Sequence, residues 1–214
     1  ILTRNIDLSV GSVIGFAAFA TGDMIASYPT LNPIVLLTYS ALIGAGFGMV
    51  NGLLVAYVRV PSIIVTLASM AIYRSFLVEF SGAKSITTEQ LPQWLTDFPN
   101  YQVFVIGDMQ FRAGFCAAAV VVLIVHLALT RLRPARQLFA VGSNPEAAEM
   151  AGIDSQRVVF TAFVFSGLMA GLAGFMFLAR FGNITVVAGL GFELNSVASA
   201  VVGGVNIFGG SGTV

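Results

Sequence analysis

Residues 33–58, PIVLLTYSALIGAGFGMVNGLLVAYV, contain no charged side chain. A helix needs about 20 predominantly apolar residues to cross the roughly 30 Å hydrocarbon core of a bilayer, and this segment is longer than that. Gly44, Gly48 and Gly52 recur every four residues, so they share one face of the expected helix. Such a stripe of small residues allows a second helix to approach closely. The segment therefore predicts a membrane-spanning helix that makes a tight helix contact.

The composition of the whole chain also indicates a membrane protein. Of the 214 residues, 57% are hydrophobic and only 9% are charged, which is too little polar surface for a soluble globule of this size. Further apolar segments approach or exceed the spanning length at residues 8–27, 62–80, 111–129 and 158–179. The fold class predicted is all-α, a polytopic transmembrane helical bundle surrounded by membrane lipid. Residues 1–214 are expected to form a single transmembrane domain, with a second small-residue stripe at Gly167, Gly171 and Gly174.

Two polar, glycine-interrupted stretches differ from these spans. NIDLSVGS at residues 5–12 and GLGFELNSVASAVVGGVNIFGGSG at residues 189–212 place Asp7 and Glu193 beside Gly and Ser, where an unbroken helix would favour neither. Non-helical backbone at membrane depth persists only where it is buried in protein or lines a wet cavity. Both stretches therefore predict broken or re-entrant segments near the two ends of the chain.

The distribution of arginine predicts the orientation. Arg131, Arg133, Arg136 and Arg157 lie in one loop, and positively charged loops are retained on the cytoplasmic side. Residues 131–157 are therefore expected to be cytoplasmic in a multi-pass protein. The segment between residues 81 and 110 then falls on the external side.

A short helix is expected inside this cytoplasmic loop, over residues 145–151. Asn144 is a favourable N-cap, Pro145 suits the first helical position, and Gly152 suits a left-handed C-terminal cap. Glu146 and Glu149 are expected to be exposed, whereas the remaining residues are small or apolar, so that a larger partner can close over the helix. A solvated loop helix with no partner is the alternative.

Several function classes lack the residues they need. The net charge is zero and no basic track is present, so we do not expect nucleic acid as a partner. His126 is the single histidine and has no ligand-type neighbour at suitable spacing, so no metal site and no catalytic triad are predicted. Residues 204–211 resemble a phosphate-binding loop, but Gly210 stands where its lysine is required. The chain is not expected to be an enzyme.

Charged residues inside the spans are costly and call for a reason. Arg74 has three candidate roles: pairing with an acid elsewhere in the bundle, extending its charge to the membrane surface, or hydrogen bonding to a polar substrate. Asp7 either caps a helix that starts near Leu8 or contacts substrate.

The motifs together resemble a known family. NIDLSVGS, PSIIVTLASMAIYR, RQLFAVGSNPEAAEMAGID, FVFSGLMAGLAGFM and GFELNSVASAVVGGVNIFGGSGTV are similar, in this order, to the permease subunits of bacterial ABC importers for monosaccharides, in the branch that includes ribose and autoinducer-2 importers. The resemblance covers essentially the whole chain. It implies a bacterial inner-membrane location and a longer permease of which this chain is an incomplete part.

The resemblance also implies partners. They are a cytoplasmic ATPase subunit that holds ATP and Mg²⁺, a second permease subunit, identical or different, and a periplasmic sugar-binding protein. No cofactor is expected in this chain itself. The short cytoplasmic helix corresponds to the family's coupling helix, which docks on the ATPase. The coupling residues are then Asn144, Pro145, Glu146, Ala147, Ala148, Glu149, Met150, Ala151 and Gly152.

A translocation path for a neutral polyol needs hydrogen-bonding groups of moderate strength, which Ser, Thr and Asn supply. We expect the path at the broken segments and the polar positions of neighbouring helices. Its predicted residues are Asp7, Ser9, Ser12, Asn51, Thr66, Ser69, Arg74, Glu193, Asn195, Ser196 and Ser199. One alternative is a branched-chain amino acid permease of the same class. Another is a secondary transporter or channel, for which the spans hold few ionisable residues.

Overall fold

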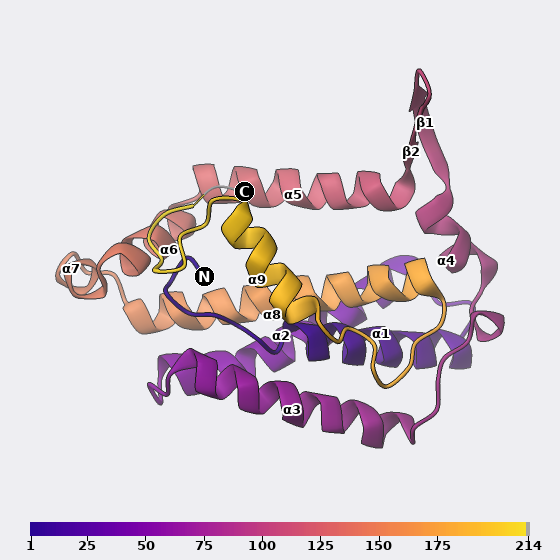
Figure 1. Ribbon diagram of the computed structural model, residues 1–214, viewed down its shortest axis with the longest axis horizontal. Helices are drawn as coiled ribbons and strands as arrows, with labels where there is room; N and C mark the ends of the chain where they lie inside the picture. Colours follow the sequence, from indigo (N-terminus) through magenta and orange to yellow (C-terminus); the bar gives the residue numbers. More distant parts are fainter. Residues whose placement is uncertain (213–214) are drawn as a thin grey trace.

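The computed structural model describes residues 1–212, which form a bundle of long helices (Figure 1). The long helices are α1 (Val10–Ser27), α2 (Pro33–Ala56), α3 (Ser62–Ser81), α5 (Ala113–Arg131) and α8 (Ser155–Phe181). Each is long and apolar enough to cross a membrane, so the predicted spans and the all-α fold class are confirmed. The glycine-interrupted stretch at residues 189–212 contains the short helix α9 (Phe192–Val202).

The limits of the spans follow from local chemistry. Asn32 accepts a hydrogen bond from the backbone N–H of Ile34 at 2.9 Å, and Pro33 occupies the first turn of α2. Gly82 and Gly182 end α3 and α8 with φ angles of 56° and 62°, in the left-handed region that glycine adopts without a Cβ clash. The predicted ends are therefore correct to within a few residues.

The two predicted small-residue stripes pack against each other, at the interface of α2 with α8. A methyl group on Gly44 would lie 2.6 Å from the backbone nitrogen of Gly171, and one on Gly167 would lie 2.8 Å from the Cα of Gly48. Both distances are too short for a side chain. Ser40 donates a buried hydrogen bond of 2.6 Å to the carbonyl of Gly171. The backbones of the two helices are thus in direct contact, as in other small-residue helix pairs.

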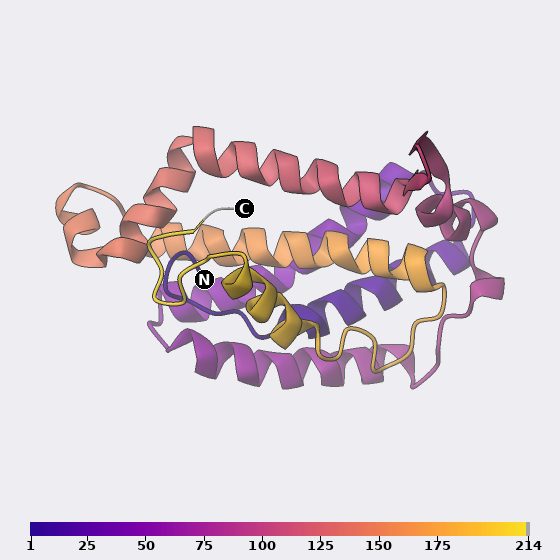
Figure 2. The same ribbon diagram turned by 45° about the horizontal axis from the view of Figure 1, so that its top comes forward.

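Helix α1 occupies the interior of the bundle, whereas α5 lies apart from it (Figures 1 and 2). Of the spanning window of α1, 67% is buried inside the protein, against 6% for α5. Ala17 of α1 lies against Gly174 of α8, where a methyl group on the glycine would be 2.8 Å from the alanine Cβ. Polar groups near the start of α1 are consequently enclosed by protein on most sides.

The two ends of the bundle carry different structures. One end bears α6 (Arg133–Ser143) and the protruding α7 (Pro145–Met150). The other bears α4 (Gln93–Asp97), the 3₁₀ turns η1 (Thr88–Gln90) and η2 (Phe98–Asn100), and an antiparallel hairpin of β1 (Gln102–Ile106) with β2 (Met109–Arg112). The hairpin and α6 were not predicted. Because residues 111 and 112 complete β2, the fourth span begins at Ala113.

The glycine contact generates a test with a control in the same helix. Gly44→Ala should lower the free energy of unfolding by about 1–3 kcal/mol, because the added methyl group forces α2 away from α8. Gly46 has open space around its Cβ position. Gly46→Ala should therefore leave stability unchanged or raise it by about 0.5–1 kcal/mol, the helix penalty of glycine.

Thermal unfolding of the detergent-solubilised protein would compare the two variants. Equal unfolding midpoints for both would contradict the proposed role of Gly44 in the helix contact.

Candidate functional site

Two segments that are not regular helices enter the middle of the bundle. Residues 1–9 run inward from the end that carries α6, and α1 starts only at Val10. Residues 182–191 turn back from the end of α8, and α9 starts at Phe192. Figures 1 and 2 both show α1 and α9 beginning close to each other, near the middle of the bundle's length. The prediction of broken segments near both ends of the chain is confirmed.

Glycines allow the first turns of α1 to touch the segment that leads into α9. A methyl group on Gly189 would lie 3.1 Å from the backbone nitrogen of Gly15, and one on Gly11 would lie 3.3 Å from the carboxylate carbon of Glu193. The first N–H groups of a helix lack intrahelical partners and carry partial positive charge. Glu193 therefore places a carboxylate where the first turns of α1 and α9 meet.

Glu193 itself is almost fully enclosed. It is 9% exposed, and its Oε1 accepts a hydrogen bond of 3.2 Å from the backbone N–H of Gly191. Its Oε2 has no hydrogen-bond partner among the described residues. Glu193 is thus a buried carboxylate held at a helix junction.

A chain of hydrogen-bonded side chains, here called the polar chain, starts in α3 and ends in α8. The Tyr73 hydroxyl lies 3.0 Å from Oδ1 of Asn51, whose Nδ2 donates to Oγ of Ser9 at 2.8 Å. Ser9 donates to Oδ1 of Asp7 through its hydroxyl at 2.7 Å and its backbone N–H at 3.0 Å. Ser166 donates to Oδ2 of Asp7 at 3.3 Å. Three of the predicted path residues, Asp7, Ser9 and Asn51, are thus brought together.

The Asp7 end of the polar chain opens into a cavity of about 270 Å³, here called the Asp7 cavity. Its polar lining comes from Asp7, Ser166 and Ser196, so it combines the N-terminal segment, α8 and α9. The rest of its wall is apolar and consists of Ile1, Leu2, Ile6, Val10, Val197, Ala200 and Val205. A small molecule with a few hydroxyl groups and C–H surfaces matches such a lining.

Arg74 has a partner that the sequence did not indicate. Its Nη1 donates to the carbonyls of Val186 at 3.1 Å and Ala188 at 2.5 Å, in the segment between α8 and α9. No ion pair of Arg74 with an acid occurs within residues 1–212. Of the three candidate roles, direct pairing with an acid is therefore not seen among these residues, and the guanidinium satisfies carbonyls that no helix satisfies.

The other predicted path residues fall into two groups. Ser12, Thr66 and Ser69 are buried, and each hydroxyl donates to a backbone carbonyl, those of Met70, Ile6 and Thr66 respectively. They tie backbone segments together. Asn195 and Ser199 are exposed on α9. Asp7 does not cap α1 directly but caps the turn at Ser9 that precedes it.

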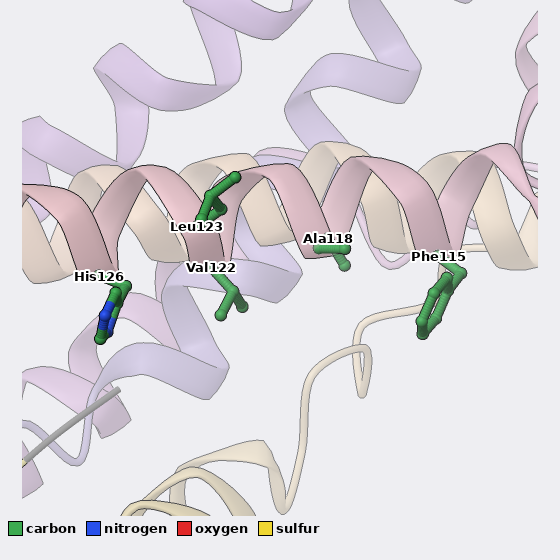
Figure 3. Close-up of a pocket in the computed structure, with 6 residues that line it drawn as sticks. Phe115, Ala118, Val122, Leu123 and His126 are labelled. Carbon is green, nitrogen blue, oxygen red and sulfur yellow. The ribbon is translucent and has the colours of Figure 1, made fainter.

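A second hollow, of about 500 Å³, runs along one face of α5 (Figure 3). Phe115, Val122 and His126 point to the same side of the helix in this view. The remaining lining residues are Ala118, Ala119 and Leu123, so His126 is the only polar side chain in the lining. Although it is larger, this hollow lacks the hydrogen-bonding groups of the Asp7 cavity.

The predicted short helix is present as α7, and both its ends are capped. The Asn144 side chain accepts a hydrogen bond of 3.0 Å from the backbone N–H of Ala147. Gly152 has φ 81°, and the Ile153 N–H returns to the carbonyl of Ala148 at 3.0 Å. Met150 is 84% exposed. The exposed surface of α7 comes mainly from Glu146, Ala147, Glu149, Met150 and the following Ala151.

Ala148 is an exception to the expected docking surface. It is only 4% exposed, because it faces inward and packs with Val141 of α6 and Val158 of α8. The expectation that Ala148 lies on the outer surface is wrong, and its role is to hold α7 onto its neighbours.

The N-terminal segment also contacts the end of α6. Arg4 donates from Nε to the carbonyl of Gly142 at 2.6 Å and from Nη2 to the carbonyl of Ser143. The Gly210 N–H donates to the carbonyl of Leu2 at 3.0 Å. The residues just before α7 are therefore joined to the segment that leads to Asp7.

Comparison with known proteins identifies the family. A family model described as "Branched-chain amino acid transport system / permease component" matches residues 1–211. The chain belongs to this permease family. Together with five helices of spanning length, the match makes it a multi-pass membrane transport component.

Individual relatives of the permease carry more specific names. An autoinducer 2 import system permease protein of Enterobacter sp. (strain 638) is 35% identical over all of this chain and 60% of its own length. Another from Yersinia enterocolitica is 34% identical over 57% of its length, and a D-allose transport system permease protein of Escherichia coli (strain K12) is 32% identical over 63%. The permease chain thus spans about six-tenths of these relatives, and the resemblance inferred from its motifs is confirmed. No solved structure matches it significantly.

Two residues of the site, Ser166 and Tyr73, were not predicted from the permease sequence. Ser166 lies within the apolar span of α8, where a lone serine is common and signals nothing by itself. Tyr73 also lies in a span, and only its contact with Asn51 reveals its place in the polar chain. Neither could be found from spacing, because both depend on which helices are neighbours.

The polar chain generates a test by double-mutant cycle. Asn51→Leu should lower the free energy of unfolding of the permease by about 1–3 kcal/mol, since it removes the donor to the Ser9 hydroxyl and one of the two acceptors of the Tyr73 hydroxyl, the other being the Phe47 carbonyl. Tyr73→Phe should cost about 0.5–1.5 kcal/mol. The double variant should deviate from the sum by about 0.5 kcal/mol or more in denaturation of the detergent-solubilised protein. Strict additivity would mean that the two side chains do not interact.

Proposed function

We propose that this chain forms part of the translocation pathway of an ATP-driven importer for a monosaccharide or similar small polyol in the bacterial inner membrane. The observation that supports this most is the meeting of two broken segments beside a buried polar chain and a cavity. Transporters commonly bind their cargo at such interrupted helices near the middle of the membrane. The names of the relatives, which refer to autoinducer 2 and D-allose, favour the same class.

The chemistry of the site favours a neutral polyol over an amino acid. A zwitterionic amino acid needs a cation or free helix N-termini for its carboxylate. Among the described residues that line the Asp7 cavity there is no Arg or Lys. Glu193 already places negative charge at the first turns of α1 and α9. A polyol instead requires the uncharged donors and acceptors that Ser166 and Ser196 offer.

We assign the coupling function to α7, with residues 131–157 on the cytoplasmic side. In this proposal the exposed surface of Glu146, Ala147, Met150 and Ala151 docks on a separate ATPase subunit, which holds ATP and Mg²⁺. A helix that protrudes from the bundle and is capped at both ends suits a rigid contact of this kind. A second permease subunit and a periplasmic sugar-binding protein would complete the importer, and lipid would cover the outer helix faces.

The coupling proposal is tested by adding bulk to the exposed side of α7. Ala151→Arg should lower ATP-dependent sugar uptake and stimulated ATP hydrolysis about tenfold or more in proteoliposomes of the assembled importer, because a close-fitting contact cannot accommodate the added side chain. The matched control is Gln93→Arg, which is exposed on α4 at the opposite end of the bundle and should leave both rates unchanged.

A normal rate in the Ala151→Arg variant would reject docking at α7. Uptake that needs an ion gradient but no ATP would instead identify a secondary transporter.

The sidedness has its own test. Single cysteines at Met150 and Gln93, in a Cys116→Ser background, should react with a membrane-impermeant thiol reagent from opposite sides of the membrane. Met150 should be labelled only from the cytoplasmic side. Labelling of both positions in intact cells would overturn the proposed orientation.

A further inference from the structure

We infer that the Asp7 cavity binds one sugar ring and that Asp7 accepts a hydrogen bond from one of its hydroxyl groups. This inference rests on the proposed function, and it assigns a specific position and specific contacts to the cargo. It also gives Ser166 a role in binding.

The two oxygens of the Asp7 carboxylate accept different numbers of hydrogen bonds from the protein. Oδ1 accepts two hydrogen bonds from Ser9, at 2.7 and 3.0 Å. Oδ2 accepts one long hydrogen bond, 3.3 Å from the Ser166 hydroxyl. A carboxylate has about four acceptor positions, so Oδ2 retains acceptor capacity, and both Asp7 and its partner Ser166 line the cavity.

The polar chain fixes the direction of these hydrogen bonds. Nδ2 of Asn51 faces Ser9, so the Ser9 hydroxyl receives that hydrogen and gives its own to Asp7. Asn51 in turn presents Oδ1 to the hydroxyl of Tyr73. The Tyr73 hydroxyl also lies 3.1 Å from the carbonyl of Phe47. The hydrogen bonds from Asn51 to Ser9, and from Ser9 and Ser166 to Asp7, all run toward Asp7, which is the acceptor at the end of the chain. A ligand at this position must donate, as a sugar hydroxyl does and a carboxylate does not.

The rest of the wall complements a sugar ring. The Ser166 hydroxyl uses its hydrogen on Asp7 and keeps its oxygen as an acceptor. Ser196, on α9, adds a second hydroxyl, while Ile6, Val10 and Val197 provide apolar surface for ring C–H groups. A volume of about 270 Å³ leaves room for a single small ring of this kind.

The alternative is that the polar chain only anchors residues 1–9 and binds no ligand. The Asp7→Asn variant separates anchoring from ligand binding. An asparagine retains Oδ1 for both hydrogen bonds from Ser9, and the Ser166 hydroxyl can turn to accept from the new NH₂ group, so the anchor is preserved. It replaces Oδ2 by an NH₂ group, which donates where the ligand hydroxyl must also donate. Ser196→Leu provides a second, independent variant, because it fills the cavity from α9 without altering the polar chain.

The experiment measures ATP-dependent uptake of D-allose and D-ribose by the assembled importer in proteoliposomes, with the unfolding midpoint of each variant. Asp7→Asn and Ser196→Leu should each lower uptake of the transported sugar about tenfold or more, as expected for loss of a charge-assisted hydrogen bond or of the space for a ring. Ser75→Ala is the control, because Ser75 is exposed on α3, its hydroxyl donates to the Ala71 carbonyl of the same helix, and it does not line the cavity. Its uptake should stay within about twofold of wild type.

A second readout reports occupancy directly. Ser196→Cys in the Cys116→Ser background should be protected from a small thiol reagent by the transported sugar but not by leucine, and Asp7→Asn should abolish this protection.

Wild-type uptake by both Asp7→Asn and Ser196→Leu would overturn the inference while leaving the proposed function in place. Absence of ATP-dependent uptake of these sugars, of other monosaccharides and of autoinducer 2 by the wild-type importer would count against the proposed function itself. If Asp7→Asn lowers the unfolding midpoint markedly, its loss of uptake does not report on binding. The uptake of Ser196→Leu then tests the inference: loss supports it and wild-type uptake overturns it.

Discussion

Backbone N–H and C=O groups that leave a helix inside a membrane must find partners in the protein, because lipid offers none. The two inward-running segments of this chain meet that requirement with side chains. The carbonyl of Ile6 accepts from Thr66, and the Ile6 N–H lies 3.4 Å from Oγ of Ser62. The carbonyls of Val186 and Ala188 accept from Arg74. The three side chains, Ser62, Thr66 and Arg74, all belong to α3. This helix therefore supplies the hydrogen-bond partners that the irregular backbone of the site requires.

The contact between α2 and α8 provides the fixed part of the architecture. Because Gly44 and Gly171 bring the two backbones together, Asn51 on α2 and Ser166 on α8 are held on either side of the N-terminal segment. The polar chain crosses three separate helices, and a small change in helix spacing would break its hydrogen bonds. Close packing at residues without side chains is therefore a condition for the chemistry at Asp7.

Much of this arrangement could be predicted from the sequence. Apolar length located the five spans, and the glycine spacing of residues 44–52 indicated a helix contact, because both signals are local. The partners of Arg74 were not predictable, since they lie more than a hundred positions away along the chain and are carbonyls, which have no sequence signature. Ala148 was misplaced because capping residues locate a helix but do not determine which of its faces meets α6. The hairpin was missed because its strands are short and exposed on both faces.

The hydrogen bonds of Arg4 to Gly142 and Ser143 make the N-terminal segment a mechanical link. Its inner end carries Asp7, and its outer end holds the two residues that precede the cap of α7. A hydrogen bond tolerates only a few tenths of an ångström of stretching before it weakens. Any larger displacement of this end of α6 relative to the bundle must therefore either break these two bonds or move the N-terminal segment, which forms part of the wall of the Asp7 cavity.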